Sequence, residues 1–226
     1  MPIIKKYRAK VVEIKKHFDD LITLSLISEK KFIYLPGQFL HLALDDYDGI
    51  GEWPESRCFS IQSSPDEKEL KITFSVKGNY TKRMREEIQL NKFVWLKLPY
   101  GDMFQRNYLK ENCVFIAGGT GVTPFLSLFN HNSFYEFQKP KIYLGFRNKN
   151  YNVFEIELGN IKNYNYEMKI FYEDLHGNLN IESIFRENPQ SKTYFISGPP
   201  LMIKNFKNFL INIGINQNCI ITDDWE

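Results

Sequence analysis

The sequence contains few cysteines, and their spacing excludes one kind of metal site. Cys58, Cys113 and Cys219 are far apart and form no CxxC pair. A plant-type iron–sulfur cluster needs four closely spaced thiolates, so this chain does not hold one. Isolated cysteines also fit a reducing compartment.

The sequence also lacks a strong net charge, a long apolar run and a metal-ligand pattern. The formal net charge is +2, and no basic stripe of the kind that binds nucleic acid is present. No run approaches the roughly 20 apolar residues of a membrane span, and the first residues lack a signal peptide's apolar segment. His17, His41, His131 and His176 show no ligand spacing. We expect a cytoplasmic protein without a transmembrane segment, a nucleic-acid partner or a metal.

The length and composition are those of a soluble globular chain with ample core material. The chain has 226 residues, 43% of them hydrophobic and 25% charged, with 19 Phe and 13 Tyr. This length permits one large domain or two of about 100 to 120 residues. Because the hydrophobic pattern changes in the middle of the chain, we predict two domains, residues 1–106 and 107–226.

The first half is predicted to be an antiparallel β-barrel, because short alternating runs are separated by turn residues. The expected hairpin turns at Asp19 and Asp20, and residues 99–102 are expected to form a turn. Thr81 is expected to cap a helix over residues 82–88, whose free amide groups could bind phosphate. Simple capping is the alternative. The expected strands are residues 10–14, 21–26, 38–44, a strand around 57–60, 70–76 and 93–98.

One stretch of this half combines three useful side chains, since Arg57, Phe59 and Ser60 are close together on an expected strand. Residues two apart on a strand share a face, so Arg57 and Phe59 point one way and Cys58 and Ser60 the other. Such a strand could bind a flat ligand that carries phosphate. An ordinary surface strand is the alternative.

The second half begins with a continuous apolar run over residues 113–117, as expected for a buried parallel strand. It leads into GGTGVTP at residues 118–124 and then an apolar helix over 125–129. Glycines allow close approach of the backbone to a pyrophosphate, and Pro124 suits a first helical turn. The third glycine of the common dinucleotide pattern is replaced by proline.

Strands and helices then alternate, which predicts a doubly wound, five-stranded parallel sheet. Ligands of such sheets lie beyond the carboxyl ends of the strands, where residues 118–123, Arg147 and residues 197–199 fall. The remaining expected strands are 141–146, 168–172, 193–197 and 219–222, and the helices are 153–158, 181–187 and 201–213.

The chain resembles the ferredoxin–NADP reductase superfamily of flavoproteins over essentially all of its length. The matching segments, in chain order, are PGQF at 36–39, RxFS at 57–60, GxxT at 78–81, PYGD at 99–102, GGTGVTP at 118–124 and GPPxM at 198–202. The resemblance implies an FAD-binding barrel followed by an NAD(P)-binding α/β domain. In that family hydride passes between the two cofactors at the interface, where the protein supplies positioning and electrostatics.

The resemblance implies a flavin role for five residues. Arg57 would hold the flavin diphosphate, Phe59 would pack on the flavin, and Ser60 would hydrogen-bond its reactive nitrogen. Gly78 and Thr81 would cradle phosphate. FAD is the expected cofactor, with FMN as the alternative. Phe59 stands where Tyr is commoner in the family.

The resemblance also implies the groups around the nicotinamide nucleotide. Ser197 stands where many members have Cys near the hydride-transfer site, so we expect a working but slower step. Asp223 falls where many members carry a carboxylate, and Trp225 matches the aromatic that covers the flavin face, although Glu226 follows it. Ser60, Ser197, Asp223 and Trp225 are thus the expected catalytic residues. Further nucleotide-binding residues are Gly118, Gly119, Thr120, Gly121, Thr123, Arg147, Gly198 and Pro199.

The nucleotide itself is NADH or NADPH. NADP-specific relatives place Ser and Arg after the third strand of this domain, whereas this chain has Glu173 and Asp174 there. Carboxylates repel a 2′-phosphate and accept hydrogen bonds from ribose hydroxyls. NADH is therefore favoured, and Arg147 is the residue that could reverse this preference.

Three functions are consistent with these features. The leading one is a reductase that passes electrons from NAD(P)H through FAD to a separate protein or small molecule, such as ferredoxin, flavodoxin, a cytochrome or an oxygenase component. The second is a reductase that uses free flavin as a substrate. The third is an electron-relay subunit of a larger complex. Loss of Ser60, Trp225 or the Gly118 loop would have supported this third function, but all of them are present.

Overall fold

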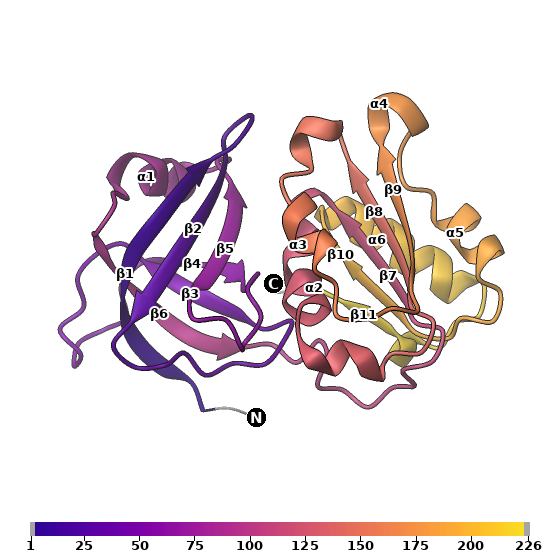
Figure 1. Ribbon diagram of the computed structural model, residues 1–226, viewed down its shortest axis with the longest axis horizontal. Coiled ribbons are helices and arrows are strands. Elements are labelled where there is room, and N and C mark those ends of the chain that lie inside the picture. Colours follow the sequence, from indigo (N-terminus) through magenta and orange to yellow (C-terminus); the bar gives the residue numbers. More distant parts are fainter. Residues whose placement is uncertain (1–2, 224–226) are drawn as a thin grey trace. The chain divides into compact units, whose positions relative to one another are not determined.

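The computed structural model describes residues 3–223 and divides the chain into two compact units, Met1–Asp102 and Met103–Glu226. Figure 1 labels the elements of both. The first unit contains β1 (Lys5–Lys16), β2 (Leu21–Ser28), β3 (Phe39–Ala43), β4 (Ser56–Ser60), β5 (Leu70–Ser75), α1 (Asn79–Glu87) and β6 (Phe93–Tyr100).

The six strands of the first unit form one sheet in the order β4-β3-β6-β1-β2-β5, and all the pairs are antiparallel. The two edge strands also approach each other, since the Gln62 amide donates to the Lys71 carbonyl at 2.8 Å. In addition, the rings of Phe59 and Phe74 lie 5.5 Å apart. The sheet therefore closes almost completely, and the predicted antiparallel barrel is confirmed.

Alternating side chains fill this barrel. On β1 the residues Tyr7, Ala9 and Val11 are buried while their neighbours face outward, as expected for a strand with one face on the core. The predicted hairpin turn is present, with Asp19 and Asp20 at positive φ.

Two local predictions in this unit are wrong. The helix begins at Asn79 rather than Lys82, with Gly78 as its N-cap, so Thr81 is the third helical residue. Its hydroxyl accepts from the Gly78 amide at 3.1 Å and thus supports the helix start from inside. The strand β6 runs through Tyr100, so only Gly101 and Asp102 of the expected turn lie outside it. Alternation alone does not reveal that Pro99 continues the strand.

The second unit consists of a parallel sheet flanked by helices (Figure 1). Its sheet order is β11-β10-β7-β8-β9. Its strands are β7 (Val114–Gly118), β8 (Lys141–Phe146), β9 (Glu167–Tyr172), β10 (Tyr194–Ser197) and β11 (Ile220–Thr222). Its α-helices are α2 (Thr123–Phe129), α3 (Glu155–Gly159), α4 (Glu173–His176), α5 (Ile181–Glu187) and α6 (Pro200–Asn212). Its short 3-10 helices are η1 (Gly119–Val122), η2 (Asn132–Glu136), η3 (Lys149–Tyr151) and η4 (Gln217–Cys219).

Each face of this sheet has its own core. Phe115 of β7 belongs to a cluster with side chains of α2 and α3, whereas Val114 and Ile116 belong to a cluster with side chains of α5 and α6. Successive residues of one strand thus serve opposite faces, which accounts for the continuous apolar run. The predicted five-stranded, doubly wound sheet is confirmed. The helix α4 was not expected, and it contains the carboxylates used to predict nucleotide preference.

Candidate functional site

Arg57 reaches the first turn of α1. Its guanidinium carbon lies 5.0 Å from the ring centroid of Tyr80, the second residue of that helix. Tyr80 is itself fixed, because its hydroxyl donates to the Leu42 carbonyl at 2.7 Å and accepts from the Leu44 amide at 3.2 Å. Burial raises the pKa of Tyr80 to about 12, so it stays neutral. The structure thus places a permanent cation beside a helix N-terminus.

The helix start next to Arg57 offers room as well as amide donors. The first amide groups of a helix have no acceptor within it and point toward solvent. A Cβ added to Gly78 would meet no atom within 4 Å. The Thr81 hydroxyl is already engaged, since it also accepts from the Lys77 amide at 3.0 Å. A phosphate group beside Arg57 and Gly78 therefore fits both the space and the charge.

The Arg57 side chain forms an ion pair with Glu55. The two charged groups are 3.1 Å apart, and each side chain is 53% exposed. The other oxygen of Glu55 lies 3.7 Å from Arg83 of α1. Sequence analysis missed Glu55, which lies two residues before Arg57 and just outside β4.

Phe59 and Ser60 point in opposite directions, as predicted. Phe59 pairs with Leu40 of β3, faces the barrel interior and is 8% exposed. Ser60 pairs with Phe39 on the other face. Most of the Phe59 ring thus serves the barrel core against Phe74, and its packing on a flavin stays a prediction.

His41 lies beside Cys58 on the same face as Ser60. The Cys58 Sγ atom is 3.5 Å from Nε2 of His41 and 3.7 Å from Nδ1. Burial raises the pKa of the Cys58 thiol, and the Arg57 charge offsets part of that rise. Burial and the Lys97 charge lower the pKa of His41. Two neutral groups thus meet here, and only the register between β3 and β4 could have predicted their contact.

In the second unit, the glycine loop after β7 packs against the loop after β10. A Cβ at Gly121 would lie 2.5 Å from both the Cα and the nitrogen of Gly198. A Cβ at Gly118 would lie 3.0 Å from Met202 and from Pro199. Backbone contact thus requires glycine at position 121, whereas the neighbours of Gly118 are side chains.

The remaining loop residues leave one side open. Gly119 has a φ of +57°, and a Cβ there would meet nothing within 4 Å. Thr123 is buried, and its hydroxyl donates to the Thr120 carbonyl at 2.9 Å. This bond ties the loop to the start of α2.

Ser197 and Asp223 are brought together by neighbouring parallel strands. Ile196 of β10 pairs with Thr222 of β11, so the residues that follow are neighbours at the carboxyl edge. The Ser197 hydroxyl donates to a carboxylate oxygen of Asp223 at 3.0 Å. Ser197 is fully buried on its strand. A hydroxyl and a carboxylate thus form one hydrogen-bonded pair where the family resemblance implies catalysis.

Arg147 lies at the same edge of the sheet, and its backbone contacts that of the acidic pair Glu173 and Asp174. Its carbonyl accepts from the Asp174 amide at 3.3 Å, and its guanidinium carbon lies 5.3 Å from the ring of Tyr151. Glu173 and Asp174 are exposed in the first turn of α4. Trp225 lies outside the residues that the structure describes.

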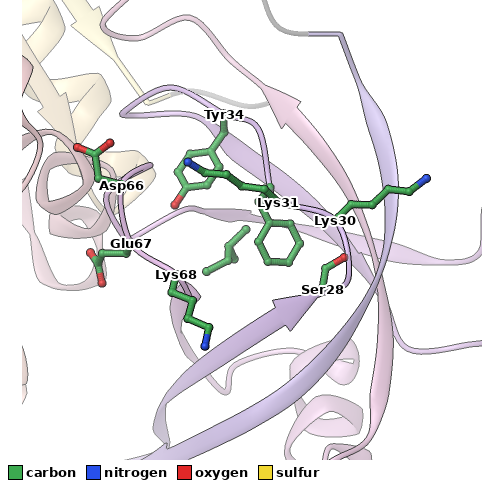
Figure 2. Close-up of a pocket in the computed structure, with 9 residues that line it drawn as sticks. Ser28, Lys30, Lys31, Tyr34, Asp66, Glu67 and Lys68 are labelled. Atoms are coloured by element: carbon green, nitrogen blue, oxygen red, sulfur yellow. The ribbon is translucent and has the colours of Figure 1, made fainter.

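A cavity of about 300 Å³ in the first unit is lined by none of these residues. Figure 2 shows Ser28, Lys30 and Lys31 on one segment of its wall and Asp66, Glu67 and Lys68 on another. Its lining mixes cations and carboxylates and includes no predicted site residue. The candidate site is therefore not this cavity.

Comparison with known sequences gives one family and several partial relatives. The profile of a family described as an FAD-binding domain matches residues 4–199. The probable electron transfer subunit of dihydroorotate dehydrogenase B (NAD(+)) from Methanopyrus kandleri is 32% identical over 128 residues, which cover 57% of this chain and 45% of that protein. The reductase component of propane 2-monooxygenase from Mycolicibacterium smegmatis is 31% identical over 150 residues, covering 64% and 41%. The chain spans less than half the length of these relatives.

Solved structures show the same two-domain fold. A ferredoxin NADP+ reductase from Neisseria gonorrhoeae with bound FAD and NADP has a TM-score of 0.79 at 18% identity, covering 97% of this chain and 98% of that one. The ferredoxin reductase in carbazole 1,9a-dioxygenase has a TM-score of 0.78 at 19% identity, covering 99% and 70%. Among residues 3–223, no helix combines the length and apolar composition needed to cross a bilayer.

Proposed function

The chain belongs to the FAD-binding domain family, and from that premise we propose that it is a flavin-dependent reductase that oxidises NAD(P)H. In this proposal residues 1–106 hold FAD and residues 107–226 hold the nicotinamide nucleotide. Bound FAD would accept hydride from the nucleotide and deliver electrons to a separate acceptor. The chain's own residues bind, orient and shield the reacting groups.

The observation that carries the proposal is the position of Arg57 at the start of α1. A guanidinium provides several N–H donors in a plane and suits phosphate oxygens, and the helix N-terminus adds amides and a partial positive charge. The open space at Gly78 leaves the helix N-terminus accessible to a phosphate group. Together these features support FAD, whose diphosphate has two anionic groups, over an uncharged flavin.

In the second unit, the packed glycines support a nucleotide site at the carboxyl edge of the sheet. Contact between Gly121 and Gly198 holds two loops together, and the Gly119 backbone remains open beside them. We assign the nucleotide diphosphate to this loop pair, with Thr120, Thr123 and Pro199 shaping it. Arg147 would contact the adenosine portion.

Ser60, Ser197 and Asp223 would handle protons and orientation. Ser60 would offer its hydroxyl to a flavin nitrogen and hold a proton there. The Ser197 hydroxyl donates a hydrogen bond to Asp223 at 3.0 Å, which would leave the lone pairs of its oxygen available to the nicotinamide. Trp225 would shield the reacting face from water.

The acidic turn of α4 supports NADH as the preferred nucleotide. Glu173 and Asp174 are both exposed in its first turn. Their negative charges would oppose a 2′-phosphate, whereas carboxylates accept hydrogen bonds from ribose hydroxyls.

The acceptor is proposed to be a separate protein, because the relatives include reductase components and an electron transfer subunit. An oxygenase component, ferredoxin, flavodoxin and a cytochrome have the appropriate chemistry. A relay subunit within a larger complex would have the same internal electron path and differ only in its partner.

The test is an absorption spectrum of the purified protein, followed by anaerobic addition of NADH and, separately, NADPH. We expect a flavin spectrum that bleaches faster with NADH. A protein that binds no flavin, purified or after addition of FAD, and oxidises neither nucleotide would refute the proposal.

A free-flavin reductase is the second candidate, because Arg57 is half exposed and already paired with Glu55. Such a site favours exchange of flavin. A colourless protein that oxidises NADH only when flavin is supplied, with turnover that saturates in flavin, would select this candidate.

A further inference from the structure

The Glu55 carboxylate occupies the guanidinium of Arg57, the group that would bind a phosphate. One carboxylate oxygen is 3.1 Å from the Arg57 guanidinium and the other is 3.7 Å from that of Arg83. Among the described residues, the Glu55 carboxylate contacts only these two cations. Its negative charge therefore lies between the guanidinium of Arg57 and that of Arg83, a residue in the middle of α1.

The two cations depend on Glu55 to different degrees. Arg83 also pairs with Asp45 and Glu87, each at 2.9 Å. Within residues 3–223, Arg57 has one charge partner, Glu55, and its other polar bond goes to the Ser56 carbonyl at 2.9 Å. Loss of the Glu55 charge would thus release Arg57 while Arg83 remained held by its other partners.

A carboxylate and a phosphate oxygen are alternative acceptors for the same guanidinium donors. A diphosphate that binds Arg57 must displace Glu55 or lie beside its negative charge, and both outcomes cost binding free energy. Because both side chains of the pair are half exposed, the ion pair is weak enough to open.

We propose that Glu55 is an internal competitor for the flavin diphosphate and sets how tightly FAD is held. This inference rests on the proposed binding of FAD at Arg57. It identifies Glu55 as a determinant of flavin affinity that acts through Arg57, and it links the charge of one loop residue to whether flavin is retained or exchanged.

The experiment is titration of FAD into flavin-free protein, followed by flavin fluorescence, with the wild type and Glu55→Gln. Glutamine keeps the shape and removes the charge. We expect Glu55→Gln to bind FAD about two- to fivefold more tightly at low salt, and the gain to shrink as salt screens the exposed charges. Glu52→Gln, in the same loop, is the matched control and should leave the affinity unchanged, because Glu52 is exposed and does not pair with Arg57.

Two further comparisons separate competition from a structural role. Riboflavin lacks phosphate, so its affinity should be the same in Glu55→Gln and the wild type. In an Arg57→Ala background the gain from Glu55→Gln should fall by at least half. Equal or weaker FAD binding by Glu55→Gln, with wild-type binding intact, overturns the role of Glu55 and leaves the reductase proposal standing. Absence of FAD binding in every variant instead refutes the proposed function itself.

Discussion

The two units carry their candidate ligand groups in contrasting ways. At the start of α1 the important groups are exposed side chains, with Arg57 held by an ion pair and open space beside Gly78. In the loops after β7 and β10 the important feature is backbone, because Gly121 and Gly198 are in direct contact. The ion pair can rearrange at little cost, whereas position 121 has no room for a single added methyl group.

This contrast shows that the charged residues bear on ligand affinity, whereas the glycines bear on packing. An exposed ion pair is worth at most about 1 kcal/mol, so affinity at Arg57 can be adjusted by single charge changes. A backbone contact inside a packed unit resists such changes, because a closely packed interior transmits strain. Substitutions in the two regions should therefore differ in whether they change ligand affinity or folding.

Gly121→Ala should produce the largest effect. The new Cβ would overlap the Gly198 backbone at 2.5 Å, so we expect the second unit to lose about 3 kcal/mol of unfolding free energy. Chemical denaturation measures this loss. Gly159→Ala is the control, since its Cβ would meet nothing within 4 Å, and it should cause no loss. Equal stability of the two variants would show that the loop contact is not rigid.

Arg57→Ala should weaken FAD binding without unfolding the first unit. Loss of hydrogen bonds to a charged group costs about 1.5 to 3 kcal/mol, which corresponds to roughly 10- to 100-fold in affinity. Flavin retention on gel filtration and a binding titration measure it. Arg85→Ala is the matched control, because Arg85 pairs with Asp20 at 2.9 Å instead. An Arg57→Ala variant that retains flavin like the wild type would refute the diphosphate assignment.

Ser197→Ala should slow reduction of the flavin while leaving FAD bound. The substitution removes the hydrogen bond to Asp223, and a loss of about 1.4 kcal/mol in the transition state lowers the rate roughly tenfold. Stopped-flow absorbance after mixing with NADH gives the rate. Ser197→Cys restores a small polar group and should reduce at least as fast as the wild type. An unchanged rate in Ser197→Ala would exclude a role in the hydride step.

Replacing Asp174 by Asn should give the smallest effect, a gain in the use of NADPH. Removal of one exposed negative charge is worth about 1 kcal/mol or less, so kcat/KM for NADPH should rise about two- to fivefold relative to NADH. Glu182→Gln removes an exposed charge on α5 that pairs with Arg186, and it should leave the ratio unchanged. If the ratio of kcat/KM for NADPH to that for NADH equals the wild-type value, the 2′-position of the nucleotide does not lie near Asp174.

Much of the fold was predictable because it depends on local periodicity. Alternation identified the barrel strands, and the apolar run at residues 113–117 identified the central strand of the parallel sheet. Element ends were less accurate, since capping by Gly78 and the continuation of β6 through Pro99 depend on backbone geometry. The helix α4 is only four residues long and has no periodicity to detect.

Sequence can bring candidate site residues together only where they are close in the chain. Arg57, Phe59 and Ser60 follow from one strand, but the proximity of Arg57 to Tyr80 depends on how α1 packs against the barrel. The pairing of Ser197 with Asp223 depends on β10 and β11 being neighbours. Sequence alone identified the chemical groups but not these partners.

The sequence by itself determined the order of the elements, the two kinds of hydrophobic period and the positions of the charged and glycine residues. These depend on interactions between residues a few positions apart. Only the tertiary structure decided that Glu55 opposes Arg57 and Arg83, that Cys58 meets His41, and that Gly121 touches Gly198. The physical reason is that such contacts depend on strand register and packing, which the order of residues along the chain does not specify.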